Sequence, residues 1–167
     1  MKLLIFGIVA SGKTTLAKAL SCRLGIPWYE GDCIAWVQDK KTRYKRTPQE
    51  QQEVIRRLDA EGDWIVEGGY RESQKILFDL ADRVIFLDPP LHVRKRRIFT
   101  RYVKQKLGLE ACHYKPDRKM LRCMYQWTRE FEEERGYYEE ILKVYENKLV
   151  RVKSKRQLVK VLETGGL

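Results

Sequence analysis

A glycine-rich segment near the N-terminus has the residue types needed to bind a polyphosphate. Residues 7–15 read GIVASGKTT and fit the pattern G-x-x-x-x-G-K-S/T, between an apolar run and a stretch with helical periodicity. Glycines let backbone N–H groups curl around a phosphate, and the N-terminus of the following helix adds the positive end of its dipole. The predicted nucleotide-binding residues in this segment are Gly7, Ala10, Ser11, Gly12, Lys13, Thr14 and Thr15.

Two of these residues have side chains suited to ATP and magnesium. Lys13 is expected to reach the β- and γ-phosphate oxygens as a catalytic cation, and the Thr14 hydroxyl to ligate Mg²⁺. Glu67 ends a short apolar run and is predicted to act on the same metal through water. A glycine loop that only joins a strand to a helix would not require lysine and threonine at these two places.

Other charged residues are candidates for an acceptor site and for catalysis. Arg71 follows Glu67 closely and is suited to a second anionic group, although a solvated arginine in a turn is the alternative. Arg97 and Arg101 are four residues apart on a predicted helix, so both project from one face and are suited to neutralising a transferring phosphoryl group. Asp32 is either the base for a hydroxyl acceptor or a turn aspartate, and the sequence leaves both readings open.

The elements that must position these residues alternate along the chain. Strands are predicted at 2–6, 26–30, 64–67, 84–87 and 149–152, and helices at 13–24, 47–60, after Pro90, at 117–134 and after Ser154. This order indicates an α/β fold with a parallel sheet and helices on both faces. Within 117–134, the stripe of Met120, Met124, Trp127 and Phe131 is interpreted as a packing face.

Length and composition limit the classes of protein to which the chain can belong. The 167 residues predict a single domain, residues 1–167. The apolar run near the N-terminus is far shorter than the roughly 20 residues that span a bilayer. The four cysteines follow no tight disulfide spacing, which predicts reduced thiols and a cytoplasmic protein without a membrane partner. Cys112, His113 and Cys123 have no C-x-x-C pair, so a structural zinc site is not expected.

The net charge of +11 predicts anionic partners. Between Leu91 and Leu109 the chain has seven basic residues and no acidic one. The charge leaves a second hypothesis open, a P-loop ATPase that binds nucleic acid nonspecifically through this basic surface. A third hypothesis is a regulatory ATP-binding protein, against which the intact Lys13 and Thr14 argue.

The chain resembles the adenylate-kinase-like P-loop kinases and, within them, the topology-modulation (FlaR-like) proteins. The resemblance covers nearly the whole chain. It rests on GIVASGKTTLAKAL, WIVEGGYRES, ADRVIFLDPP, the Arg97 and Arg101 pair, and VRVKSKRQLVKVL. The chain departs from the nucleotide kinases at Tyr70, where they often have proline, and in 102–119, which matches no known lid.

The resemblance implies a three-layer P-loop NTPase fold with about five parallel strands and a helical lid at about 91–135. It implies an ATP-dependent phosphotransferase that moves the γ-phosphoryl group of ATP to a small, anionic acceptor, with Mg²⁺. Gly68 and Arg71 then stand at the acceptor site, Arg97 and Arg101 in the lid, and Lys153 near the adenine. Affecting DNA topology is the alternative activity that the family name suggests. The acceptor and the oligomeric state are left open.

Overall fold

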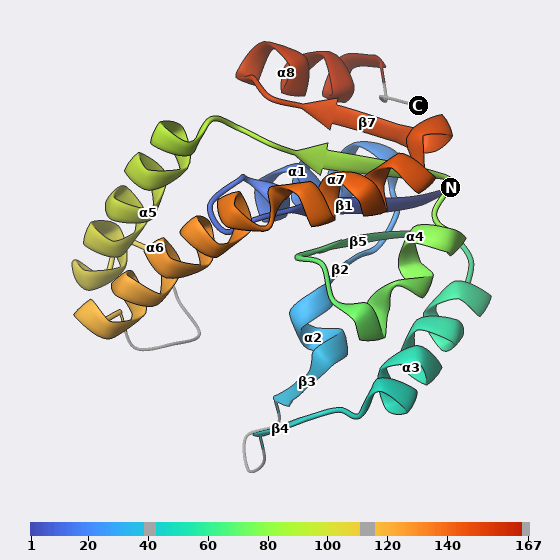
Figure 1. Ribbon diagram of the computed structural model, residues 1–167. Coiled ribbons are helices and arrows are strands. Elements are labelled where there is room, and N and C mark those ends of the chain that lie inside the picture. The colour runs from blue at the N-terminus through green and yellow to red at the C-terminus, as the bar shows by residue number, and fades with distance from the viewer. Residues whose placement is uncertain (39–42, 111–115, 165–167) are drawn as a thin grey trace.

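A five-stranded parallel sheet forms the centre of the computed structural model, which describes residues 1–38, 43–110 and 116–164 (Figure 1). Its strand order is β2-β5-β1-β6-β7. The strands are β1 (Lys2–Gly7), β2 (Trp28–Glu30), β5 (Trp64–Gly68), β6 (Arg83–Leu87) and β7 (Leu149–Val152). The predicted parallel sheet of about five strands is therefore confirmed.

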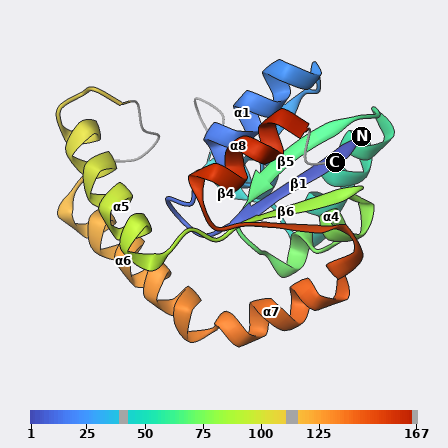
Figure 2. The same ribbon diagram turned by 90° about the horizontal axis from the view of Figure 1, so that it is seen from above.

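Helices cover both faces of the sheet, because alternate side chains of the buried strands point to opposite sides. Leu3 and Ile5 of β1 pack with α1 (Lys13–Leu24) and α8 (Lys155–Thr164). Leu4 and Phe6 pack on the other face, in a cluster that includes residues of α3 (Pro48–Ala60), α4 (Ile76–Leu80) and α7 (Arg135–Val144). Figure 2 shows α1 and α8 on one side of the strands and α7 on the other. This is the predicted three-layer arrangement.

The predicted lid segment forms two helices that extend beyond the sheet. Helices α5 (Leu91–Lys106) and α6 (Arg118–Glu133) pack against each other and stand clear of the central strands (Figures 1 and 2). Arg94 joins them: its guanidinium is buried, donates to Glu132 and lies 5.7 Å from the Phe131 ring centroid. Among the described residues, no helix is long and apolar enough to cross a membrane.

Several helix ends follow local signals. Thr47 and Glu50 form a capping box at the start of α3, and Asp117 accepts a hydrogen bond from the Met120 amide at the start of α6. The predicted strand at 26–30 is shorter in the structure and begins at Trp28. Gly25, in the left-handed conformation with φ 69°, ends α1 just before it.

Short elements between the predicted ones do not follow from sequence periodicity. Helix α2 (Gly31–Ala35) and the antiparallel pair β3 (Trp36–Gln38) and β4 (Arg43–Lys45) lie between β2 and α3. The Arg46 side chain, between β4 and α3, donates to the carbonyl oxygens of Cys33 and Ile34, 2.7 and 3.1 Å away. Elements of three to five residues are too short to show a period.

The interpretation of Trp127 as a core residue is wrong. Met124 and Phe131 of α6 are 6% and 4% exposed, whereas Trp127 is 46% exposed. With 3.6 residues per turn, Trp127 is rotated about 60° from Met124 around the helix axis, so it lies at the margin of the buried stripe. Thr128 is fully buried in the same helix.

Candidate active site

The loop between β1 and α1 has the backbone geometry of a phosphate cradle. Gly12 has φ 106° and Ala10 has φ 59°, so both adopt a left-handed conformation that is costly for most residues. A Cβ added at Gly7 would lie 2.8 Å from both the Leu87 carbonyl oxygen and Ser11 Oγ. The Ser11 hydroxyl is buried and has no hydrogen-bond partner among the described residues. An unpartnered hydroxyl in a tight loop that begins a helix fits a bound phosphate oxygen.

Thr14 and Glu67 meet at the start of α1. Thr14 Oγ1 donates a hydrogen bond of 2.6 Å to Glu67 Oε1, and Glu67 is 6% exposed. Burial raises the pKa of Glu67, while the Lys13 charge and the Thr14 hydroxyl oppose the shift. A hydroxyl and a carboxylate are hard oxygen donors of the kind Mg²⁺ prefers. The donor set therefore fits the predicted magnesium site.

Lys13 lies across the loop and is surrounded by charges from four other elements of the chain. Its ammonium donates to the Ile8 carbonyl oxygen, 3.1 Å away. Burial lowers the pKa of Lys13; the Glu67 and Asp32 carboxylates oppose this, and Arg101 and Arg71 lower it further. The charged form of this partly buried ammonium is thus disfavoured. Polyphosphate oxygens would stabilise it by adding negative charge.

Asp32 and Arg71 form an ion pair that the sequence did not predict as a pair. Arg71 Nη2 lies 2.5 Å from Asp32 Oδ1, although the residues are 39 positions apart. Asp32 follows β2 and Arg71 follows β5, two neighbouring parallel strands whose carboxyl ends meet at one edge. The Arg71 Nη1 atom is buried without a partner among the described residues, so it keeps donors for another anion.

Gly68 lies beside this pair because two backbones approach closely there. A Cβ on Gly68 would lie 3.6 Å from the Gly31 Cα, and one on Gly31 would lie 3.3 Å from the Glu67 carbonyl oxygen. The contact at Gly31 is tight, so the absence of a Cβ there lets the ends of β2 and β5 approach, whereas the distance at Gly68 is an ordinary contact. The role of Gly68 at the acceptor site stays a prediction.

The lid reaches the phosphate loop through Arg97. Its Nη1 atom donates to the carbonyl oxygens of Ser11 and Ala10, at 2.9 and 3.3 Å. Arg101 lies one turn further along α5 and forms an ion pair with Glu110, with Nε 3.3 Å from Oε1. Arg94 is buried in the helix pair and has a structural role. Of the basic residues in α5, Arg97 and Arg101 are the two that act on the loop and its lysine.

The remaining predicted residues lie around this centre. Thr15 is exposed on the first turn of α1. Lys153 is exposed and follows β7. Strand β7 lies two positions from β1 in the sheet, so these two strands are about 10 Å apart. Its backbone N–H donates to Gln157 Oε1, 2.7 Å away. No contact ties Lys153 to the loop in the described part of the chain, so its role near the adenine stays a prediction.

Two other features lie apart from the loop. A cavity of about 460 Å³ lies at the edge strand β2, lined by residues that include Trp28, Glu30 and Leu58, and contains no predicted phosphate ligand. Groups of three or more metal-ligating side chains are absent from residues 1–38, 43–110 and 116–164. The Cys112 and His113 candidates lie outside the described residues.

Comparisons with known proteins support the fold. No protein-family model matches the chain, and no curated protein matches it at a significant level. The chain is similar to a gluconokinase from Sinorhizobium meliloti 1021, with a TM-score of 0.56, 18% identity and coverage of 97% of this chain and 87% of the other. It is also similar to a shikimate kinase from Acinetobacter baumannii in complex with shikimate, with a TM-score of 0.55, 14% identity and 98% and 91% coverage.

A third similar structure is deoxyadenosine kinase from M. mycoides with bound dATP. Its TM-score is 0.52 at 17% identity, with both chains fully covered. These identities establish a shared fold, the α/β fold of P-loop kinases, and not a shared activity. The narrower resemblance to topology-modulation proteins receives no support from them.

Proposed function

We propose that this protein is an ATP-dependent phosphotransferase whose acceptor is a small molecule with a hydroxyl group and an acidic group. The observation that carries the proposal is the Asp32–Arg71 ion pair, whose two charges both act on Lys13 beside the phosphate loop. A carboxylate and a guanidinium together suit an acceptor that offers one proton donor and one anion. The proposal keeps the predicted enzyme class and narrows the acceptor.

The residues for ATP and Mg²⁺ come from the loop and from β5. The loop amides and Lys13 would hold the phosphates, and Thr14 with Glu67 would hold Mg²⁺, Glu67 through water. Bound ATP supplies the phosphoryl group, and Mg²⁺ neutralises part of its charge. The Thr14–Glu67 hydrogen bond would hold both side chains in the orientation needed to bind the metal, Thr14 directly and Glu67 through water.

The lid arginines stabilise charge during transfer. Arg97 already lies against the carbonyl oxygens of the loop, and Arg101 is close enough for its charge to act on Lys13. A small shift of α5 would exchange the carbonyl contacts of Arg97 for phosphoryl oxygens, which bind a guanidinium more strongly. The lid therefore supplies cations that Lys13 alone cannot.

Asp32 favours a hydroxyl acceptor over a phosphate acceptor. A hydroxyl must lose its proton on transfer, and the Asp32 carboxylate would accept it. A phosphate acceptor already has an anionic oxygen and would be repelled by the same carboxylate. Arg71, with its unpartnered Nη1, would bind the acid group of the acceptor. Gluconokinase and shikimate kinase, by their names, act on hydroxy acids, which agrees with this chemistry.

The test measures ADP release from Mg-ATP with a panel of hydroxy acids: gluconate, shikimate, glycerol 3-phosphate and thymidine 3′-phosphate. We expect at least one of them to raise turnover well above the acceptor-free rate. Asp32→Asn should lower kcat about 10²- to 10³-fold with a small change in KM. Arg71→Met should mainly raise KM.

Control variants distinguish effects on the active site from effects on the stability of the whole protein. Arg129→Gln alters an exposed arginine that pairs with Glu133 within α6, and it should leave turnover unchanged. Lys13→Ala should abolish transfer. Duplex DNA at two salt concentrations tests the nucleic-acid hypothesis, and stimulation by DNA with no response to any small acceptor would refute the proposal.

A further inference from the structure

Helix α6 adds a second wall to the lid, and its orientation follows from its contacts with α5. Arg94 of α5 pairs with Glu132 and lies over Phe131. These contacts place the Arg94 turn of α5 beside the last turns of α6. The helices run antiparallel, since α5 leaves the sheet and α6 returns to it (Figure 1). Counting 1.5 Å per residue along each helix brings Trp127 to about the level of Arg97 and Ile98.

The side of α6 that Trp127 occupies can be worked out from helical geometry. Relative to the buried Ile98, Lys95 and Arg97 lie on opposite flanks of α5. The Tyr125 hydroxyl donates to the Lys95 carbonyl oxygen, 3.2 Å away, so Tyr125 lies on the Lys95 flank of the hairpin. In α6, Trp127 projects about 160° away from Tyr125. Trp127 therefore lies on the Arg97 flank, which faces the phosphate loop.

Trp127 also differs from the other three tryptophans in having no partner in the part of the chain that the structure describes. Trp64 is fully buried and donates to Asp59, Trp28 lies under the Lys18 ammonium, and Trp36 lies under the Arg43 guanidinium. Within the described residues, Trp127 has neither a ring contact nor a cation contact nor a hydrogen bond, and it is 46% exposed.

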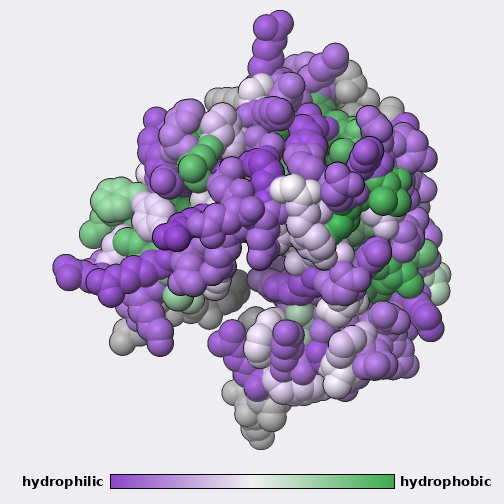
Figure 3. Space-filling view, in the orientation of Figure 1, coloured by the Kyte–Doolittle hydropathy of each residue, from purple (hydrophilic) through white to green (hydrophobic). Residues whose placement is uncertain are grey.

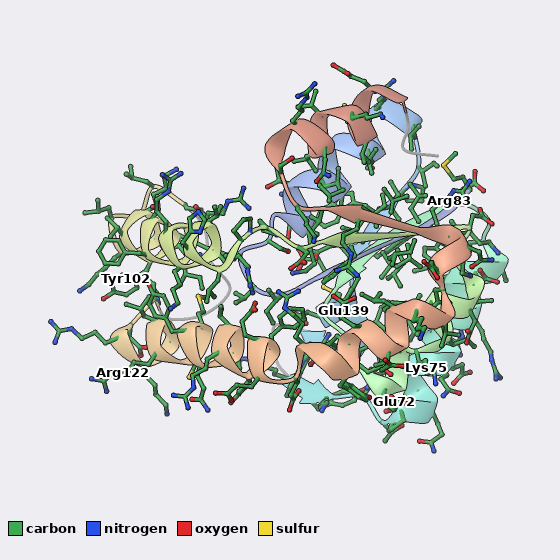
Figure 4. All side chains as sticks on the ribbon, turned by 45° about the horizontal axis from the view of Figure 1, so that its top comes forward. Glu72, Lys75, Arg83, Tyr102, Arg122 and Glu139 are labelled. Carbon is green, nitrogen blue, oxygen red and sulfur yellow. The ribbon has the colours of Figure 1, made fainter. Side chains whose placement is uncertain are left out.

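The lid borders an open space. Figure 3 shows a hollow between the lid and the part of the molecule that contains α2 and the β3–β4 pair. Asp32 stands at the start of α2, and Arg71, which pairs with it, follows β5. Figure 4 shows Tyr102 and Arg122 towards the free end of the lid, further from the sheet.

We propose that Trp127 is the lid's contact with the acceptor and that the acceptor presents a ring to it. The inference rests on the proposed function and narrows its substrate class to ring-bearing hydroxy acids. An indole offers a flat apolar face that stacks on a planar or ring-shaped group, and an open-chain acid gives it less to cover. Asp32 and Arg71 then bind the hydroxyl and acid groups of the acceptor, and Trp127 stacks on its ring.

The expected effect is on binding. Stacking of an aromatic ring on an aromatic side chain is worth about 1–3 kcal/mol, which corresponds to roughly 5- to 150-fold in KM. Trp127→Leu should raise KM for a ring-bearing acceptor within that range, while kcat changes little. Trp127→Phe keeps an aromatic face and should restore most of the loss.

The experiment compares two acceptor classes with Mg-ATP: shikimate and thymidine 3′-phosphate, which contain rings, and gluconate and glycerol 3-phosphate, which do not. Phe99→Leu is the matched control, because Phe99 is 55% exposed on the opposite flank of the same lid. Intrinsic fluorescence gives a second readout: a ring-bearing acceptor should change emission in the wild type and not in Trp127→Phe.

The outcomes separate this inference from the proposed function. Preference for a ring-bearing acceptor, lost in Trp127→Leu and kept in Phe99→Leu, supports it. Transfer to open-chain acceptors alone, or an unchanged KM in Trp127→Leu, overturns the role of Trp127 and leaves the phosphotransferase intact. Transfer to none of the four acceptors removes the proposed function, and the inference with it.

Discussion

The hydrogen bond between Thr14 and Glu67 supports a quantitative prediction. Thr14→Val removes the hydroxyl with little change in shape, and it leaves a carboxylate that is 6% exposed without its 2.6 Å donor. Thr14→Ser keeps the hydroxyl and removes only a methyl group, so it is the matched control. The two variants therefore differ mainly in whether Glu67 retains this hydrogen bond.

The size of the effect follows from the charge and burial of the acceptor. A hydrogen bond to a charged group contributes about 1.5–3 kcal/mol, so Thr14→Val should lower the free energy of unfolding by about 2 kcal/mol at pH 8. For a chain of this length that corresponds to a decrease in Tm of about 4–8 °C. In a Glu67→Gln background the same bond is between neutral groups, and Thr14→Val should cost only about 1 kcal/mol. The double-mutant cycle should thus show a coupling of about 1 kcal/mol.

Urea unfolding of the four proteins in the cycle, with Thr14→Ser alongside, measures these differences. Calorimetry with ATP adds a functional readout: Thr14→Val should lose the enhancement of ATP affinity by Mg²⁺, and Thr14→Ser should keep it. If Thr14→Val and Thr14→Ser agree within about 0.5 kcal/mol, the bond contributes nothing and the reasoning is refuted.

Three further predictions concern the pH dependence of stability, the lid arginines, and the ion pair between Asp88 and Arg135. Burial raises the folded-state pKa of Glu67 above its ordinary value of 4.5, so its contribution to stability is complete below that value and is lost as pH rises through the folded-state pKa. Glu67→Gln should therefore exceed the wild type in stability at pH 8, with an advantage that shrinks towards pH 4.5 in urea titrations. Arg97→Met and Arg101→Met should lower kcat about 10³-fold or more and barely change the ATP Kd, and wild-type kcat in both would remove them from the mechanism. Asp88→Asn should destabilise the protein by about 1.5–3 kcal/mol in urea unfolding, because Asp88, which is 9% exposed, accepts two hydrogen bonds from the partly buried Arg135, at 3.0 and 3.1 Å; a loss below about 0.5 kcal/mol would contradict a stabilising pair.

The sequence alone determined the features that are local in the chain. The phosphate loop from Gly7 to Thr14 is contiguous, and its glycines, lysine and threonine are required by the loop itself, so spacing was sufficient to predict it. The helices predicted at 13–24 and 47–60 also depend on local signals, and their ends agree with α1 and with α3 and its cap Thr47. The alternation of strands and helices was enough to predict a parallel sheet, since a parallel connection needs a crossover.

The tertiary structure decided which distant residues share the site. The order β2-β5-β1 places Asp32 beside Arg71, and the same order joins Thr14 to Glu67, 53 residues away. Several strand orders satisfy the same pattern of elements, so the sequence could not choose these pairs. The burial of Arg94 and the exposure of Trp127 were likewise undecided, because apolar periodicity gives the face of a helix but not the width of the surface that its neighbours cover. The phosphate loop could be predicted because its residues are adjacent in the chain. The acceptor site depends on packing between segments that come together only on folding.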